Sequence, residues 1–306
     1  MSPSQIYAIL PIFNKDVVTR LPAPWSLADD LIFRAGEEIE RRMMQEDSSV
    51  MLPDGVCNNV FHISFTGKNE EIEKHKKTFE DNIKLDALCL QSVFNLVAEN
   101  SGTMVIPYGI IIETQRIQKI KNVVDFELDF PSSKLTSYSA LPKITNQDIQ
   151  LLFILTRRVI KTDKQLQTTF RRFCSAFMKS NWEDRLIDLT IALESLIPSQ
   201  TEIKFKFSLY LSLIVSDNPE KRKEIHGMLS DLYDARSGIV HGTSSETRKA
   251  IEESKKNWDK LVDILKQCIL YRLEFRDKFP DQDWKKHLLS LSLGNSSTNW
   301  NIEVIT

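Results

Sequence analysis

The segment Asp231–Gly242, with the sequence DLYDARSGIVHG, holds the residues of this chain whose types and spacing are best suited to chemistry. It contains Arg236 and His241. An arginine keeps its positive charge at any physiological pH, whereas an unperturbed histidine titrates near pH ~6.5. An arginine can hold a phosphate while a histidine moves a proton, and metal-free cleavage of RNA requires both actions. The spacing alone is a weak signal, because roughly one such Arg–His pair is expected by chance in a chain of this length.

Arg236 and His241 do not share a face of a regular helix, because five positions correspond to roughly 140° of rotation. Gly238 lies between them and can relax the backbone. Ser237 lies four residues before His241 and Asp234 seven before, so the helix offers an Asp–Ser–His polar stripe with Arg236 at its flank. The alternative reading is that His241 is an ordinary structural histidine.

A carboxylate stands out on the helix expected over residues 182–197. Glu194 shares a face with four uncharged residues, and burial of an unpaired charge is costly, so it should find a cation or become protonated. We expect Arg236 as its partner, with His241 second. The alternative is that Glu194 only anchors one helix to the next loop. The other members of this face are Ile187, Thr190, Ile191 and Ile197.

The net charge of −2 gives no global attraction to nucleic acid, so any RNA contact must come from local basic patches. The alternative is that each patch is simply a solvated helix face. The candidate residues are Arg157, Arg158, Lys161, Arg171, Arg172, Lys204, Lys206, Lys221, Arg222 and Lys223.

Metal, cofactor and membrane roles find little support. The chain lacks a glycine-rich phosphate loop and a His-Glu-x-x-His pair, and the acidic pairs Glu127/Asp129 and Asp281/Asp283 are expected to be surface charge. No uncharged run approaches the ~18 residues needed to span a bilayer, and no secretory signal is evident. We therefore expect no cofactor, no metal and a cytoplasmic location. Four widely spaced cysteines fit reduced thiols there: Cys57, Cys89, Cys174 and Cys268.

The chain is predicted to have an α+β fold, with a mixed α/β domain over residues 1–140 and an all-α bundle over residues 144–292. A polar tail covers residues 293–306. The boundary is expected within Pro131–Lys143, which contains two prolines and a polar spacer. In the first domain, helices are expected over Glu70–Glu80 and Lys84–Glu99, and Leu27–Gln45 should start extended and end helical. β-branched and aromatic runs predict strands at Ile6–Phe13, Val60–Thr66, Thr103–Thr114 and Val123–Phe130.

The remainder of the chain shows helical periodicity almost throughout, and short connections favour an antiparallel bundle. Asp163 is expected to cap a helix, and Pro219 suits the first turn of another. The predicted helices run from about residue 146 to Lys161, from Asp163 to Ser180, and over Trp182–Ile197, Lys204–Val215, Pro219 to Tyr233 or beyond, Ser245–Phe275 and Trp284–Leu291.

The two segments Trp182–Leu196 (WEDRLIDLTIALESL) and Leu232–Gly242 (LYDARSGIVHG) together resemble the Apea-like branch of the HEPN superfamily. That branch tends to carry an Ala-Leu-Glu-x-Leu helix followed by an Arg-Ser-x-x-Val-His-Gly segment, in this order and at about this separation. The resemblance covers roughly residues 163–275 and does not extend convincingly into the first 140 residues.

The resemblance implies a metal-independent endoribonuclease, commonly with two copies meeting across a homodimer interface. It assigns the scissile phosphate to Arg236, proton transfer to His241, and orientation of the cation to Glu194. Ser237 stands where many relatives have Asn, His or Asp, so its supporting role is open. The family includes anti-phage nucleases, which implies an RNA substrate and a role as a toxin in anti-phage defence or abortive infection, and suggests a phage-derived trigger or an antitoxin.

Two other functions remain open. The helical part could be a non-catalytic HEPN module that binds RNA, a nucleotide or a partner protein. It could also be a scaffold whose Arg–His pair only stabilises a dimer. Residues 1–140 contain no motif for chemistry, and a sensing or restraining role for them is inferred from position alone.

Overall fold

The structure is a computed structural model that describes residues 4–11, 25–28, 31–35, 59–67, 69–97, 108–113, 116–121, 146–198, 201–242 and 245–294. Side chains are described over residues 81–93, 95–96, 150–198, 201–242 and 248–294. The chain divides into two compact units, Met1–Arg157 and Arg158–Thr306. The boundary expected within residues 131–143 and the tail from residue 295 onward lie outside the described residues.

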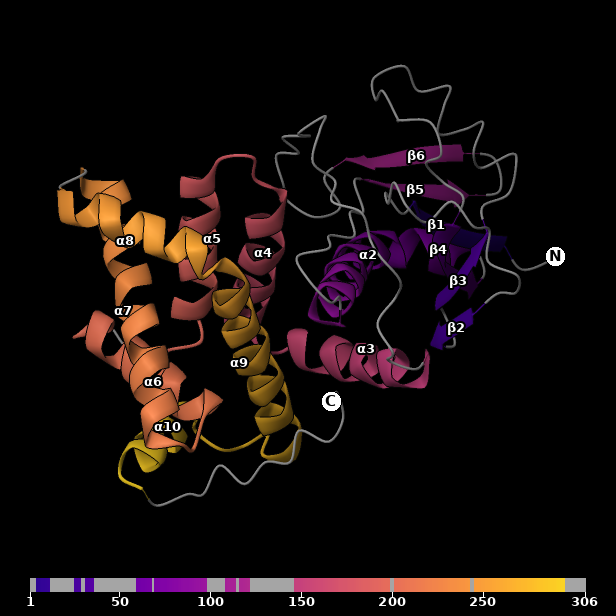
Figure 1. The fold of residues 1–306 in the computed structure, drawn as a ribbon. Coiled ribbons are helices and arrows are strands. Elements are labelled where there is room, and N and C mark those ends of the chain that lie inside the picture. Colours follow the sequence, from indigo (N-terminus) through magenta and orange to yellow (C-terminus); the bar gives the residue numbers. More distant parts are fainter. Residues whose placement is uncertain are drawn as a thin grey trace. The chain divides into compact units, whose positions relative to one another are not determined.

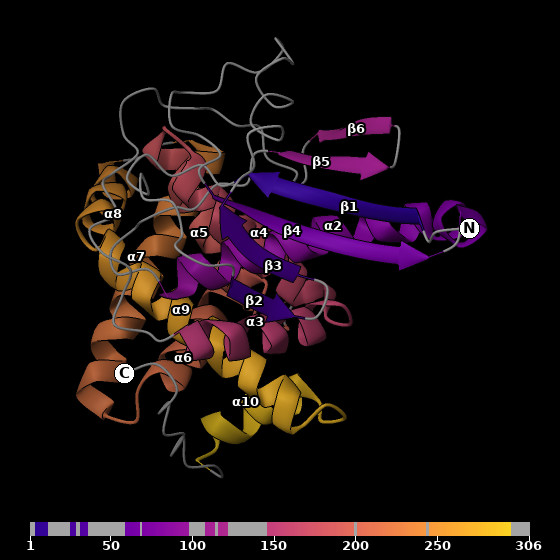
Figure 2. The ribbon, with the colours of Figure 1, turned by 90° about the vertical axis from the view of Figure 1, so that its right-hand side faces the viewer.

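The backbone of the first unit forms a six-stranded antiparallel arrangement in the order β2-β3-β4-β1-β5-β6 (Figure 2). β1 pairs with β4 from Ser4 opposite Gly67 to Pro11 opposite Val60. The long helix α2 (Asn69–Val97) packs against β1 and β4. The strands are β1 (Ser4–Pro11), β2 (Trp25–Ala28), β3 (Leu31–Ala35), β4 (Asn59–Gly67), β5 (Tyr108–Glu113) and β6 (Arg116–Lys121).

Side-chain packing in the first unit is described on α2 and on α3 (Asn146–Ile160). Both helices bury apolar side chains, among them Leu90 and Phe153, which have no exposed surface. Arg157 joins them with a two-point ion pair: its Nε and Nη2 each donate to a carboxylate oxygen of the buried Asp86 at 2.7 Å. The planar guanidinium matches a carboxylate in this geometry, so the contact fixes orientation as well as distance.

The predicted α+β class was wrong for the part of the chain whose side chains are described. Of that part, 84% is helical and none lies in a strand or sheet. Every buried side chain there belongs to a helix or to a turn next to one. The strands of the first unit are defined by the pairing of their backbones. The buried side chains that are described lie mainly on apolar stripes of helical period. The described core is therefore all-helical.

The second unit is built from antiparallel helices joined by short turns (Figure 1). α4 packs on α5, α6 on α7, and α7 on both α5 and α8, while α9 contacts α5 and α6. Phe170, Phe173 and Phe207 lie fully buried between them. The helices are α4 (Lys164–Met178), α5 (Trp182–Glu194), α6 (Ile203–Val215), α7 (Pro219–His241), α8 (Ser245–Lys256), α9 (Trp258–Lys278) and α10 (Trp284–Ser292).

Polar side chains cap several of these helices at their first turn. The Asp163 carboxylate accepts hydrogen bonds from the backbone N–H groups of Gln165 and Leu166, which confirms the predicted cap of α4. Asn218 caps α7 in the same way, and Pro219 occupies the first turn as predicted. Such caps satisfy N–H groups that have no partner within the helix.

Two predicted helix boundaries were wrong. Residues 245–275 form two helices, because α8 ends at Lys256 and α9 begins at Trp258. Asn257 separates them, and its side-chain amide donates to the carbonyl of Glu253 at 3.0 Å, a local bond that competes with helix continuation. In the first unit, the two helices predicted between residues 70 and 99 are one helix, α2.

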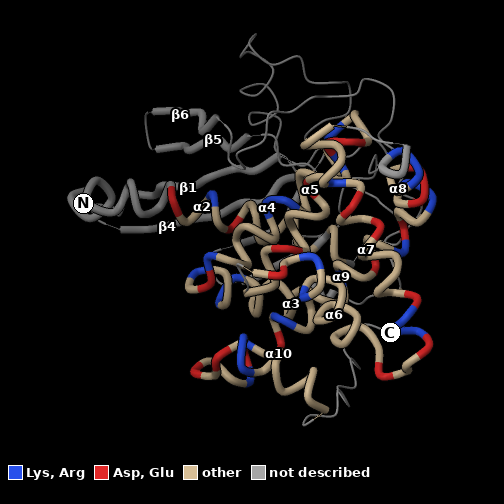
Figure 3. Tube along the Cα trace, turned by 90° about the vertical axis from the view of Figure 1, so that its left-hand side faces the viewer, with Lys and Arg blue, Asp and Glu red and all other residues tan. Residues whose placement is uncertain are grey.

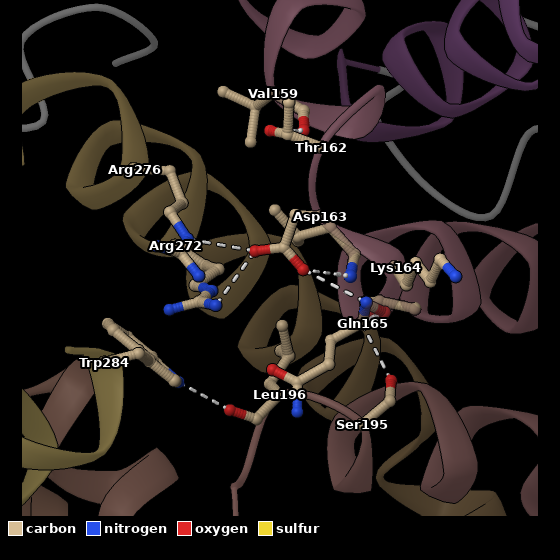
Figure 4. Close-up of polar contacts among 12 residues, drawn as sticks. Val159, Thr162, Asp163, Lys164, Gln165, Ser195, Leu196, Arg272, Arg276 and Trp284 are labelled. Atoms are coloured by element: carbon tan, nitrogen blue, oxygen red, sulfur yellow. Dashed lines mark hydrogen bonds and ion pairs between the residues drawn. The ribbon is translucent and has the colours of Figure 1, made fainter. Parts of the chain in front are cut away.

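A buried polar cluster joins α4, α9 and α10 (Figure 4). Oδ2 of Asp163 accepts hydrogen bonds from Arg272 at 2.9 Å and from Arg276 at 3.1 Å. The Arg272 guanidinium lies over the ring of Trp284, 4.4 Å from its centroid. His287 stacks on Trp284 and shares a 2.7 Å hydrogen bond with the hydroxyl of Tyr271. One carboxylate therefore caps α4 and ties α9 to it.

None of the helices in the described ranges combines the length and apolar character that crossing a bilayer demands.

Candidate functional site

Helix α7 carries Arg236, Ser237 and His241 on one uninterrupted segment, Pro219–His241. It ends at Gly242, whose N–H donates to the carbonyl of Gly238 at 2.9 Å and whose φ of +107° favours glycine. Gly238 is buried within the helix and does not break it. The rotation of roughly 140° between Arg236 and His241 is therefore retained, and the two side chains leave α7 in different directions.

The Arg236 side chain is half-buried, and its Nε is excluded from solvent without a hydrogen-bond partner. Its position relative to Tyr233 and Val240, three before and four after, places all three on one face of α7. Tyr233 contacts Phe207 of α6, with ring centroids 5.6 Å apart. An unmade hydrogen bond to a buried donor costs about 1–3 kcal/mol, so Arg236 is positioned at an energetic cost that its contacts here do not explain.

His241 is exposed at the last position of α7, and Ser237 one turn earlier is half-buried. Asp234, the third member of the predicted polar stripe, is engaged elsewhere. Lys204 Nζ of α6 lies 2.7 Å from each oxygen of its carboxylate. This ion pair is exposed, so it contributes little to stability, and Lys204 can leave Asp234 for another anion at little cost.

Glu194 is the last residue of α5, a helix that packs against α7. Within the described residues, no hydrogen bond or ion pair joins Glu194 to Arg236 or His241. α5 ends at residue 194, and the Glu194 side chain is partly exposed. Water can therefore solvate the carboxylate, which removes the need for a paired cation.

The turn that follows Glu194 is held by side chains that the sequence did not single out. Thr169 of α4 and Ser195 share a hydrogen bond between their hydroxyl oxygens at 2.8 Å. Trp284 Nε1 of α10 donates to the carbonyl of Leu196 at 2.7 Å (Figure 4). The partners are far apart along the chain, so no local pattern could have indicated either contact.

Most residues of the expected basic patches are paired with carboxylates. Acidic and basic residues alternate along the described parts of α7 and α8, and neither helix is uniformly basic along its length (Figure 3). The pairing supports the simpler reading of these patches as solvated faces, because a paired lysine or arginine projects little net charge. The pairs are Arg157–Asp86, Arg158–Asp277, Arg172–Asp188, Lys204–Asp234, Lys206–Glu202 and Arg222–Asp217.

The acidic and cysteine residues considered from sequence have ordinary surroundings where they are described. Asp283 caps α10 by accepting from the N–H of Lys286 at 3.1 Å, and this backbone hydrogen bond lowers its pKa. No group of three or more His, Cys, Asp or Glu side chains suited to a metal occurs in the described ranges. Cys89, Cys174 and Cys268 are buried. Glu127, Asp129 and Cys57 lie outside the described residues.

No known protein family, curated protein or solved structure matches this chain. The candidate site therefore rests on its own residues: a half-buried arginine with a free N–H donor, an exposed histidine one turn and a half further along the same helix, and a partly exposed carboxylate on the neighbouring helix.

Proposed function

We propose that the chain is a metal-independent endoribonuclease whose reacting groups are carried by α7. The observation that carries this proposal is the state of Arg236: a half-buried guanidinium whose Nε is buried and makes no hydrogen bond. Because Nε has no partner to give up, the half-buried side chain can turn outward and offer its N–H groups to an anion, and a phosphodiester oxygen is an acceptor of matching charge and geometry.

In the proposed reaction, Arg236 binds the non-bridging oxygens of the scissile phosphate and stabilises the charge that develops on them. Neutral His241 accepts the proton of the ribose 2′-hydroxyl as its oxygen attacks phosphorus. The bond from phosphorus to the 5′-oxygen breaks, and that oxygen takes up a proton. The products are a 2′,3′-cyclic phosphate and a 5′-hydroxyl end, so the substrate must be RNA and not DNA.

Glu194 and Ser237 have supporting parts in this proposal. The partly exposed Glu194 carboxylate can turn toward an arginine or an imidazolium once a substrate excludes water, because ion pairs strengthen as the local dielectric falls. Ser237 lies one turn before His241 on the same face and can donate to or accept from the imidazole.

The proposal includes a homodimer formed through the helical part. Arg236 and His241 of one chain diverge by roughly 140°, so a second copy supplies the simplest way to bring an arginine and a histidine to one phosphodiester. The resemblance of Trp182–Leu196 and Leu232–Gly242 to the Apea-like HEPN branch supports this arrangement. It also supports a role in anti-phage defence in the cytoplasm, with a phage-derived trigger or an antitoxin as regulator.

The divergence of the two side chains equally favours a second function, a non-catalytic module that binds RNA, a nucleotide or a partner protein. Binding of a phosphate needs only the free N–H donor of Arg236 and does not require His241 to reach the same atom.

The deciding experiment compares wild type with Arg236→Ala, Arg236→Lys and His241→Ala on tRNA and mRNA in excess EDTA. We expect cleavage with cyclic-phosphate ends by wild type, loss of cleavage in both alanine variants, and partial loss in Arg236→Lys, which keeps the charge but not the planar fork. His226→Ala serves as the matched control. His226 is also on α7, but its side chain is hydrogen-bonded to Ser208 of α6.

Cleavage that survives Arg236→Ala or His241→Ala at the wild-type rate overturns the nuclease proposal. RNA binding without cleavage by wild type, lost only in Arg236→Ala, establishes the binding module. Toxicity on expression adds an assay in cells, where a trigger is available: equal toxicity of wild type and His241→Ala counts against the nuclease.

A further inference from the structure

The turn after Glu194 ends α5 and is capped by a side chain from a distant helix. The last carbonyl groups of a helix have no partner within it and must find one elsewhere. At this turn, Ile197 N–H satisfies the carbonyl of Glu194 at 3.0 Å, and the indole N–H of Trp284 satisfies that of Leu196 at 2.7 Å. Leu196 and Trp284 are both buried, so water does not readily replace the indole.

Trp284 is itself fixed by the buried cluster of α9 (Figure 4). Its ring lies against the Arg272 guanidinium and packs on Phe275, with ring centroids 5.0 Å apart. Arg272 in turn donates to Asp163, which caps α4. The side chains that make this series of contacts, from Asp163 through Arg272 to Trp284 and Phe275, are all buried. The indole N–H of Trp284 is therefore held in a defined direction.

We propose that Trp284 is a positioning residue: by capping α5 from α10, it holds in place the turn that carries Glu194 beside α7. This inference deepens the proposed function and rests on it for the part Glu194 plays in the reaction. The structural part stands on the contacts alone. Within the described residues, the hydrogen bond and ring contacts of Trp284 go to Leu196 and to residues of α9 and α10, so it acts on Glu194 through the backbone of Leu196.

The chain offers a matched control for this role. Trp258 is also a buried tryptophan, but its Nε1 has no hydrogen-bond partner. Trp284→Phe and Trp258→Phe each replace an indole with a smaller aromatic ring in the same core. Only the first removes a hydrogen bond, so a difference between the two variants reports the cap and not the loss of ring volume.

The test is hydrogen–deuterium exchange of the full chain, read by mass spectrometry on peptides that span residues 193–198. For Trp284→Phe we expect exchange about three- to tenfold faster in these peptides than in wild type, the range expected for loss of one hydrogen bond. Peptides within α7 should keep their protection, and Trp258→Phe should leave residues 193–198 unchanged. Trp284→Tyr, which also lacks the indole N–H, provides a second variant if Trp284→Phe folds poorly.

If a folded Trp284 variant exchanges residues 193–198 at the same rate as wild type, the proposal is overturned. So does an equal acceleration in Trp258→Phe, which would indicate general loosening of the core. Where wild type cleaves RNA, Trp284→Phe should lower kcat with KM unchanged, and an unaltered kcat also overturns the positioning role. A wild-type protein that neither cleaves RNA in vitro nor is toxic on expression refutes the proposed nuclease, and the exchange result alone then decides whether Trp284 caps the turn.

Discussion

Arg272 donates from Nη2 to Oδ2 of Asp163 at 2.9 Å, and both side chains are almost completely buried. Burial by itself would raise the pKa of Asp163, but the N–H of Leu166 and the charges of Arg272 and Arg276 together hold it below the ordinary value. Burial lowers the pKa of Arg272 to about 10 in spite of the carboxylate beside it. The pair thus remains charged at neutral pH inside the helical core.

Asp163→Ala is expected to destabilise the protein strongly. The change leaves the buried guanidinium of Arg272 without its main carboxylate partner. Removal of one partner of a buried ion pair lowers the free energy of unfolding by about 3–5 kcal/mol. The substitution also removes the cap of α4, a further loss of about 1 kcal/mol. Denaturant unfolding measures the sum. Asp277→Ala is the control, because its ion pair with Arg158 is exposed and should change stability by less than about 1 kcal/mol.

The stability of the helical unit should fall in mild acid because of His287. Burial, and secondly the charge of Arg272, lowers the pKa of His287 below 6.5 in the folded protein. The unfolded chain therefore binds the proton more readily, so the stabilisation present above about pH 6.5 is lost as pH falls through the folded-state pKa. His287→Phe keeps an aromatic ring against Trp284 and should flatten this part of the curve of unfolding free energy against pH. An unchanged slope would exclude His287 as its source.

Arg236→Met should leave the protein as stable as wild type or slightly more stable. The substitution removes a buried donor that has no hydrogen-bond partner, while the methionine retains most of the apolar contact of the stem. We expect a change in unfolding free energy between about 0 and +1 kcal/mol, together with loss of RNA binding. A loss of more than about 2 kcal/mol would show that Arg236 stabilises the fold, since such values are typical of structural groups.

The glycine that follows α7 and a glycine inside it should respond to alanine in opposite directions. At Gly242 the φ of +107° strains any other residue, so Gly242→Ala should cost about 1 kcal/mol or more. At Gly227, inside the helix, an added Cβ meets nothing within 4 Å, and alanine should stabilise by about 0.5–1 kcal/mol. Thermal unfolding of the two variants measures both changes. A stabilised Gly242→Ala would contradict the left-handed end of α7.

Much of the helical unit could be predicted because its signals are local. Asp163 and Pro219 mark helix starts through chemistry that acts within one turn, and the observed helices begin beside them. The long helix predicted through Asn257 was wrong, because helical periodicity continues across a residue whose side chain bonds the preceding turn. The α+β class was wrong for the described core because strand-like composition does not show which elements bury side chains.

The candidate site was only partly predictable. The pattern singled out Arg236 and His241 as candidates, and its expectation that Glu194 pairs with Arg236 was drawn on a helix that ran three residues beyond the observed end of α5. The contacts that fix the neighbouring turn join residues 26 and 88 positions apart. Such pairings depend on how the helices pack, and hydrophobic period alone does not determine them.

The unbroken course of α7 restricts how the protein could be switched. Arg236 and His241 are separated along the axis by about 7.5 Å of helical rise, a spacing that cannot change unless backbone hydrogen bonds break. A regulator therefore cannot change the spacing of these two backbone positions within one chain while α7 stays intact. It must act by displacing the whole helix as a rigid body, or by altering what approaches it.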